Sequence, residues 1–320
     1  MADLQSSTAP REGGVLAGFD MAAHGRRIKA RDKAATVVLT VIVGLVLAML
    51  AAIVGYVLVS GAGKLFDIGF LTGKPEQFKA GGGIGPELFN SFYLLVLTLL
   101  ISVPLSLGAA IFLAEYAPDN AATRIAKTLI ETLSSLPSIV VGLFGFLFFV
   151  LQMGWGFSII AGAVALTMFN VPILVRVIQQ ALEDVPRTQR DAALAMGLTR
   201  WETTVHVLLP VAMPAIVTGV VLSAGRVFGE AAALIFTAGQ SAPMLDFTNF
   251  DLSSPTCPWS VFRPAETLAV HIWKINSEGV VPDLEAVSNG TAAVLLACIL
   301  LFNVLARLIG KFLERRLTSE

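Results

Sequence analysis

Residues 36–60 read TVVLTVIVGLVLAMLAAIVGYVLVS, an apolar run of 25 residues without a charge. A run of this length can cross the hydrocarbon core of a bilayer, about 30 Å thick, as one α-helix. Inside hydrocarbon a helix satisfies every backbone N–H and C=O group within its own segment. The preceding residues are polar and basic, without a short apolar region followed by a small-residue cleavage site. We therefore expect a retained membrane helix rather than a removed signal peptide.

The composition of the whole chain agrees with this reading. Of its 320 residues 55% are hydrophobic and only 14% are charged, whereas soluble domains carry about 25% charged residues. The net charge of −1 provides no basic field for nucleic acid, so we expect no nucleic-acid partner. The two cysteines, Cys257 in a polar loop and Cys298 in an apolar run, predict no disulfide.

Further apolar runs extend the prediction to an all-α polytopic membrane protein. We place six transmembrane helices at residues 36–60, 88–114, 133–153, 157–178, 211–238 and 289–309. They form one transmembrane domain over 36–310, between a basic N-terminal tail (1–35) and a short C-terminal tail (311–320). The 239–288 loop holds prolines that interrupt any long helix, but Thr267 to Ile275 could form a short one.

The basic residues divide unevenly between the two sides. Of the 22 Lys and Arg residues, 16 fall in the N-terminal tail, the 115–132 loop, the 176–210 connection and the C-terminal end. Five fall on the opposite side, and Arg226 remains inside a span. The positive-inside rule then places both termini in the cytoplasm, which requires an even number of spans. The loop at 180–210 is accordingly cytoplasmic and the loop at 239–288 extracytoplasmic.

The cytoplasmic loop reads EDVPRTQRDAALAMGLTRWETTVHVLLP over residues 183–210. Good helix formers run from Arg187 to Met196, and Gly197 stands where a left-handed C-terminal cap needs no Cβ. Thr199 and Glu202 have the spacing of a capping box, which predicts the start of a second helix. We expect Pro210 to end that second helix. Two short helices joined by a tight turn would project into the cytoplasm.

This loop resembles the EAA signature of ABC importer permeases, which reads E-A-A, three residues, G, nine residues, then I-x-L-P. The matching positions are Asp191, Ala192, Ala193, Gly197, Val207, Leu209 and Pro210. Asp191 replaces the usual Glu and Val207 the usual Ile. The resemblance implies a type I importer permease core (MetI-like), with the loop acting as the coupling helix that docks on a separate ATPase subunit.

Two charges lie inside the fifth predicted span. Arg226 and Glu230 have i,i+4 spacing, so in a continuous helix they share one face and can pair. Arg176 lies near the inner end of the fourth span. A charge at mid-bilayer costs about 2.5–3.5 kcal/mol on insertion scales. The pair either locks helix packing or, with Arg176, lines a pathway for an oxyanion, because guanidinium groups offer forked donors that match phosphate oxygens.

Further stretches resemble the PstA family of phosphate permeases across residues 28–310. They are Gly81–Ile84, Ala110–Tyr116, Pro137–Phe144, Val171–Arg176 and Arg226–Ala238. The resemblance implies phosphate import at a bacterial cytoplasmic (inner) membrane, with Arg226, Glu230 and Arg176 in the pathway. It also implies a sister permease, two ATPase subunits and an extracytoplasmic phosphate-binding protein as partners, besides membrane lipid.

One motif departs from that family. The usual Gly-Glu-Thr-Ala-Pro-Leu reads GEAAAL over residues 229–234, which removes a hydroxyl and a kink near Glu230. Sulfate, molybdate or a phosphonate therefore remain open as cargo. A self-sufficient secondary carrier or channel is the other alternative, although we find none of the internal repeats common in carriers.

No residues of this chain predict a cofactor site. The sequence GAGK at residues 61–64 lacks the first glycine and the Ser or Thr of a phosphate-binding loop. ATP would therefore bind to and be hydrolysed by a partner chain, and this chain would be a transport subunit rather than an enzyme. The three histidines, His24, His206 and His271, are scattered without metal-ligand spacing, so we predict no metal site. Glu115 borders the inner end of the second span, where we expect a solvated end charge.

Overall fold

A computed structural model describes residues 21–76, 78–279 and 281–318 of the chain. Over those residues the chain is helical and forms no strand, which confirms the all-α prediction. By its contacts the chain divides into two units, Met1–Tyr56 and Val57–Glu320, which we describe separately. The helices, with π-helical turns labelled η, are α1 (Met21–Leu65), α2 (Ile68–Thr72), α3 (Gly85–Ile111), η1 (Phe112–Tyr116), α4 (Ala121–Ser134), α5 (Ser138–Gly145), η2 (Phe146–Gln152), α6 (Ile159–Glu183), α7 (Arg187–Ala195), α8 (Arg200–Thr203), η3 (Thr204–Leu208), α9 (Leu209–Phe228), α10 (Ala232–Thr237), α11 (Leu268–Glu278) and α12 (Leu284–Thr318).

Within the described residues, five helices are long and apolar enough to cross a membrane, or six if one bent pair counts as a span. The five are Arg31–Leu65, Gly85–Tyr116, Ile159–Glu183, Arg200–Phe228 and Leu284–Phe312. In the first unit the apolar part of α1 exposes Val, Leu and Ile side chains along its length. Such a surface is suited to lipid rather than to water.

The third predicted span, 133–153, is not one helix. The chain bends by 97° between α4 and the continuous helix Ser138–Gln152. Pro137 stands at the bend and precedes the first residue of α5. Proline disfavours helical backbone in the residue before it, so Leu136 cannot continue the helix of α4. α4 itself is amphipathic, and none of its side chains is buried in this chain.

The fifth predicted span, 211–238, begins too late and extends too far. The helix starts at Arg200 and ends at Phe228, and a break at Gly229 separates it from α10. The break occurs although the proline of the related motif is absent. Close packing holds α10 apart, since a Cβ on Gly142 of α5 would lie 2.7 Å from the Cα of Ala233.

Pro210 does not end a helix, contrary to the prediction. It lies near the start of α9, directly after the π-helical turn η3. In that turn the amide of Leu209 donates to the carbonyl of Thr204, five residues back. A proline ring collides with the carbonyl four residues before it in a regular α-helix. The wider turn is one of the local adjustments that let a helix pass a proline.

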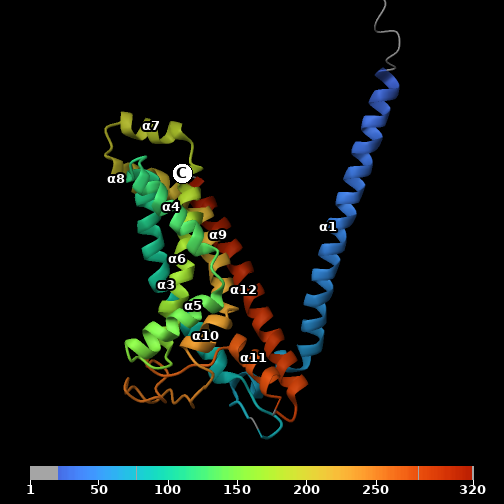
Figure 1. The fold of residues 1–320 in the computed structure, drawn as a ribbon, viewed down its shortest axis with the longest axis vertical. Coiled ribbons are helices and arrows are strands. Elements are labelled where there is room, and N and C mark those ends of the chain that lie inside the picture. The colour runs from blue at the N-terminus through green and yellow to red at the C-terminus, as the bar shows by residue number, and fades with distance from the viewer. Residues whose placement is uncertain (1–20, 77, 280, 319–320) are drawn as a thin grey trace, which may run out of the picture. The chain divides into compact units, whose positions relative to one another are not determined.

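α6 lies at the centre of the second unit. Two-thirds of its most apolar stretch, 67%, is buried, a larger share than in any other candidate span among the described residues. It packs against α3, α4 and α9. In this unit α7 and α8 lie at one end, and α10 and α11 at the opposite end (Figure 1). The predicted short helix near Thr267 is confirmed as α11, which Thr267 caps.

Candidate functional site: the α7–α8 segment and the intramembrane charges

The α7–α8 segment, residues 187–208, has the local geometry that its sequence predicts. α7 ends in a left-handed turn at Gly197, whose φ is +89°. The amides of Gly197 and Leu198 donate to the carbonyls of Leu194 and Ala193 at 3.0 and 3.2 Å. This is the Schellman pattern, which satisfies the last carbonyls of a helix. A Cβ at this position would meet nothing within 4 Å, so lack of space does not explain the glycine. The left-handed backbone conformation is the reason for it.

The second helix begins with the predicted capping box. The Thr199 hydroxyl accepts from the Glu202 amide, and the Glu202 carboxylate accepts from the Thr199 amide at 2.8 Å. Both hydrogen bonds use backbone amides that the helix start would otherwise leave without a partner. The start of α8 is thereby determined by two side chains three residues apart, Thr199 and Glu202.

An ion pair ties the segment to the membrane helices. Arg190 of α7 contacts Glu115 of η1, whose side chain is mostly buried. The prediction of a solvated Glu115 was wrong, because the fold returns α7 to the end of the α3 helix. Leu208 is also fully buried, in a cluster that includes Leu174 and Ile178 of α6. The segment therefore contacts two spans, the α3–η1 helix through Glu115 and α6 through Leu208.

The outer face of the segment exposes large apolar side chains. Met196 is 83% exposed, Trp201 59% and Leu194 42%. Of the signature positions, Asp191, Ala192 and Gly197 are exposed, Ala193 is buried, and Leu209 and Pro210 are intermediate. Several large apolar side chains exposed on one short segment are typical of a protein-binding surface.

A polar layer crosses the second unit within the spans. Asn170 of α6 is fully buried and donates to the hydroxyl of Ser102 on α3 at 3.1 Å. Its carbonyl accepts from the hydroxyl of Ser223 on α9. One side chain therefore links three spans. Asn170 was not among the predicted site residues, although an amide in an apolar run is a signal that could have identified it.

Arg226 lies beside this layer, one turn after Ser223 on α9. Its guanidinium carbon is 5.2 Å from the centre of the Phe169 ring on α6, a cation–π contact. The side chain is otherwise exposed in this chain. Arg176, further along α6, is also exposed.

The predicted pairing of Arg226 with Glu230 on one helical face is wrong. The helix ends at Phe228, so Glu230 lies past its end, where the i,i+4 relation no longer applies. The Glu230 carboxylate instead accepts from the Ala233 amide of α10 at 3.2 Å. Among residues 21–76, 78–279 and 281–318, the ion pairs include none between Glu230 and Arg226 or Arg176.

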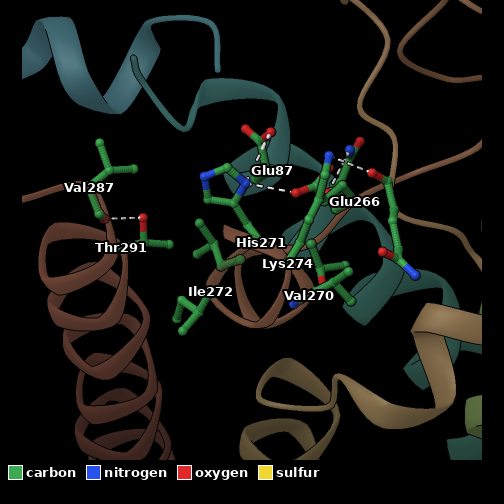
Figure 2. A network of polar contacts seen from close by, with 12 residues as sticks. Glu87, Glu266, Val270, His271, Ile272, Lys274, Val287 and Thr291 are labelled. Atoms are coloured by element: carbon green, nitrogen blue, oxygen red, sulfur yellow. Dashed lines mark hydrogen bonds and ion pairs between the residues drawn. The ribbon is translucent and has the colours of Figure 1, made fainter. Parts of the chain in front are cut away.

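A second buried polar network lies at the opposite end of the unit, around α11 (Figure 2). Arg263 is 2% exposed and donates to the side-chain oxygen of Asn90 at 2.7 Å and to the Pro258 carbonyl at 3.1 Å. Burial lowers the pKa of the Arg263 guanidinium to about 10, so it stays charged at neutral pH. Beside it, His271 of α11 contacts Glu266. Sequence spacing did not reveal this network because Asn90 lies 173 positions from Arg263 in the chain.

Comparisons with known proteins identify the family. Residues 106–319 match the family described as "Binding-protein-dependent transport system inner membrane component". The chain belongs to this family. It is 49% identical over 292 residues to the probable ABC transporter permease protein YqgI of Bacillus subtilis, covering 91% of this chain and 99% of that protein. It is 34% identical over 241 residues to the phosphate transport system permease protein PstA of Yersinia pestis, covering 73% and 75%.

Solved structures of other ABC transporters share the fold. A bacterial ABC transporter that imports the acidic polysaccharide alginate has a chain with a TM-score of 0.59 and 17% identity, over 90% of this chain and 99% of that one. The MetNI methionine ABC transporter, in an inward-facing form, has one with a TM-score of 0.53 and 19% identity, over 72% and 94%. The predicted fold is thereby confirmed: this multi-pass protein is a PstA-like permease subunit of an ABC importer, a transport component rather than an enzyme.

Proposed function

We propose that this permease carries inorganic phosphate across the bacterial cytoplasmic membrane, with both termini in the cytoplasm. The support for phosphate is the likeness to PstA permeases, which are named as phosphate transport proteins. The support for the orientation is the excess of Lys and Arg on one side. In this arrangement α7–α8 faces the cytoplasm and α11 faces outward.

The proposal that phosphate is the cargo rests on the surroundings of Arg226. It lies in a span, its side chain is exposed in this chain, and it has no ion pair with Glu230. An arginine facing lipid near mid-bilayer costs about 2.5–3.5 kcal/mol or more. The exposed face of α9 must then face a sister permease or an aqueous pathway. Forked guanidinium donors in such a pathway match the oxygens of phosphate. Arg176 and Glu230 are the other residues that we propose to line this pathway.

The α7–α8 segment would couple transport to ATP hydrolysis on separate ATPase subunits. Its apolar tip, around Met196 and Trp201, suits a groove on such a subunit. Its anchors, Glu115 and Leu208, would pass movement of the tip to two spans. The remaining partners would be a sister permease and an extracytoplasmic phosphate-binding protein. The alginate transporter has been solved in complex with a periplasmic protein, which supports the last of these.

The cargo is tested by uptake of labelled phosphate into proteoliposomes that hold the assembled importer. Arg226→Gln should lower uptake roughly tenfold to hundredfold, the equivalent of one lost charged hydrogen bond. Arg124→Gln, an exposed arginine on α4, is the matched control and should transport normally. Normal uptake with Arg226→Gln would contradict the pathway. Stronger competition by sulfate, molybdate or a phosphonate than by unlabelled phosphate would reassign the cargo.

The coupling role is tested with Gly197→Pro. Proline fixes φ near −65° and cannot adopt the observed φ of +89°. The variant should assemble in the membrane but lose ATP-dependent uptake. Wild-type uptake by this variant, or uptake by wild-type vesicles that lack any ATPase subunit, would contradict coupling and favour a secondary carrier.

A further inference from the structure

Two carboxylates and one imidazole meet in the interior at the α11 end of the second unit. Glu87 comes from the first turn of α3, Glu266 directly precedes the cap of α11, and His271 lies on α11. Figure 2 shows their side chains converging between these segments. One candidate ligand atom from each residue lies within 4.8 Å of the other two.

The distances between the three groups lie on either side of the spacing of metal ligands. His271 Nδ1 is 2.7 Å from Glu266 Oε1 and 3.9 Å from Glu87 Oε1. Zinc sites place nitrogen and oxygen ligands at about 2.0–2.2 Å from the metal, so neighbouring ligand atoms lie roughly 3.3 Å apart. Small side-chain rotations bring these atoms to that spacing.

Glu87 is the member of the group whose carboxylate has no hydrogen bond, although it lies 3.9 Å from His271. Its side chain is fully buried, and neither of its carboxylate oxygens accepts a hydrogen bond. An uncompensated buried carboxylate is costly, and proteins place a proton, an opposite charge or a metal beside it. His271 Nδ1 faces it but is already hydrogen-bonded to Glu266.

We propose that Glu87, Glu266 and His271 bind one divalent transition-metal cation, with Zn²⁺ the best fit. One imidazole and two carboxylates form a ligand set that suits Zn²⁺, whereas Ca²⁺ and Mg²⁺ prefer oxygen alone. Three protein ligands leave one position of a tetrahedral site open. Glu266 and His271 also line a cavity of about 200 Å³, which provides a path for the ion and room for a water ligand.

The neighbours of the site orient one ligand and set the local charge. Lys274 donates to the second oxygen of Glu266 at 3.0 Å and to the Gln240 carbonyl at 2.8 Å, so it orients the carboxylate and leaves Oε1 toward the site. Its positive charge opposes the metal, but Glu76 and Glu278 also line the cavity and restore a negative field. Bound metal would join the start of α3 to α11, and so hold the 239–266 loop against the spans.

The test is zinc binding by the full-length chain, purified in detergent and equilibrated with ZnCl₂ in excess MgCl₂. Metal content by mass spectrometry should give about one zinc per chain. Glu87→Gln and His271→Gln should each weaken binding by at least about tenfold. His206→Gln, an exposed position at the other end of the unit, is the control and should bind zinc like the wild type.

A second set of measurements uses the wild type, so that the test does not depend on whether the variants fold. Zinc should raise the unfolding temperature of the wild type. Co²⁺ should give the visible absorption of a low-coordinate nitrogen and oxygen site, and added zinc should abolish this absorption by displacing the Co²⁺. Wild-type protein without bound zinc, or equal zinc in wild type and Glu87→Gln, would overturn the proposal. Glu87 would then be a buried carboxyl kept neutral by a proton.

Discussion

The two ends of the second unit are built from different kinds of contact. In the α7–α8 segment the ordering hydrogen bonds join residues three to five apart, as between Thr199 and Glu202. Around α11 they join distant segments: Asn90 to Glu266 across 176 positions, and Ser91 to Leu268 across 177. The turn and cap of the first end are exposed and determined locally, whereas the second network is buried and forms only when the whole unit folds.

This difference predicts where substitutions are costly. Removing a local cap loosens one helix end, and water replaces the lost partner. Removing a member of the buried network leaves other polar groups without a partner and without access to water, which costs more than the bond itself contributes. Four variants test this comparison.

The largest effect is expected for Arg263→Leu. The substitution leaves the side-chain oxygen of Asn90 and the Pro258 carbonyl without their donor in the interior. We expect a loss of about 3–5 kcal/mol in the free energy of unfolding, since each buried acceptor left without a donor costs about 1–3 kcal/mol. Thermal unfolding of the full chain in detergent measures it. Arg124→Leu, at an exposed site, should change it by less than about 0.5 kcal/mol. Similar losses in the two variants would contradict the comparison.

Gly197→Ala should have an intermediate effect that stays local. An alanine has space at this site, so its cost is that of left-handed backbone alone, about 1–2 kcal/mol. Hydrogen exchange should accelerate across residues 187–208 and remain unchanged around α11. Gly197→Asn should cost less, because Asn tolerates this conformation. Faster exchange throughout the chain would show that the segment is not locally determined.

Thr199→Ala removes the first hydrogen bond of the capping box and leaves the Glu202 amide without its partner. The expected cost is about 1 kcal/mol, confined to exchange at the start of α8. Thr199→Ser keeps the hydroxyl and should behave like the wild type. If Ser and Ala variants exchange equally, the cap contributes nothing to the segment.

Asp283→Ala should have the smallest effect, about 0.5 kcal/mol in thermal unfolding. Its carboxylate accepts from the Gly81 amide at 2.9 Å across 202 positions, but this bond is exposed. The variant therefore separates the effect of sequence distance from that of burial. A loss as large as that of Arg263→Leu would mean that sequence distance, rather than burial, makes the α11 end costly to disturb.

Two of the predictions that failed, the Arg226–Glu230 pair and the solvated Glu115, share one cause. The pairing of Arg226 with Glu230 assumed a helix that continues past Gly229, but packing of Ala233 against Gly142 holds a separate helix there. Glu115 was assigned to solvent because its partner, Arg190, is remote in the sequence. In both cases the missing information was which element packs against which.

The amino-acid sequence by itself determined the helical membrane class, the left-handed turn at Gly197 and the capping box at Thr199. These depend on hydropathy and on hydrogen bonds within a few residues, which short stretches of sequence encode. Only the tertiary structure decided that Arg263 is buried against Asn90 and that Glu87 meets His271. Such contacts bring together side chains from distant segments, and neither residue spacing nor composition records which segments become neighbours.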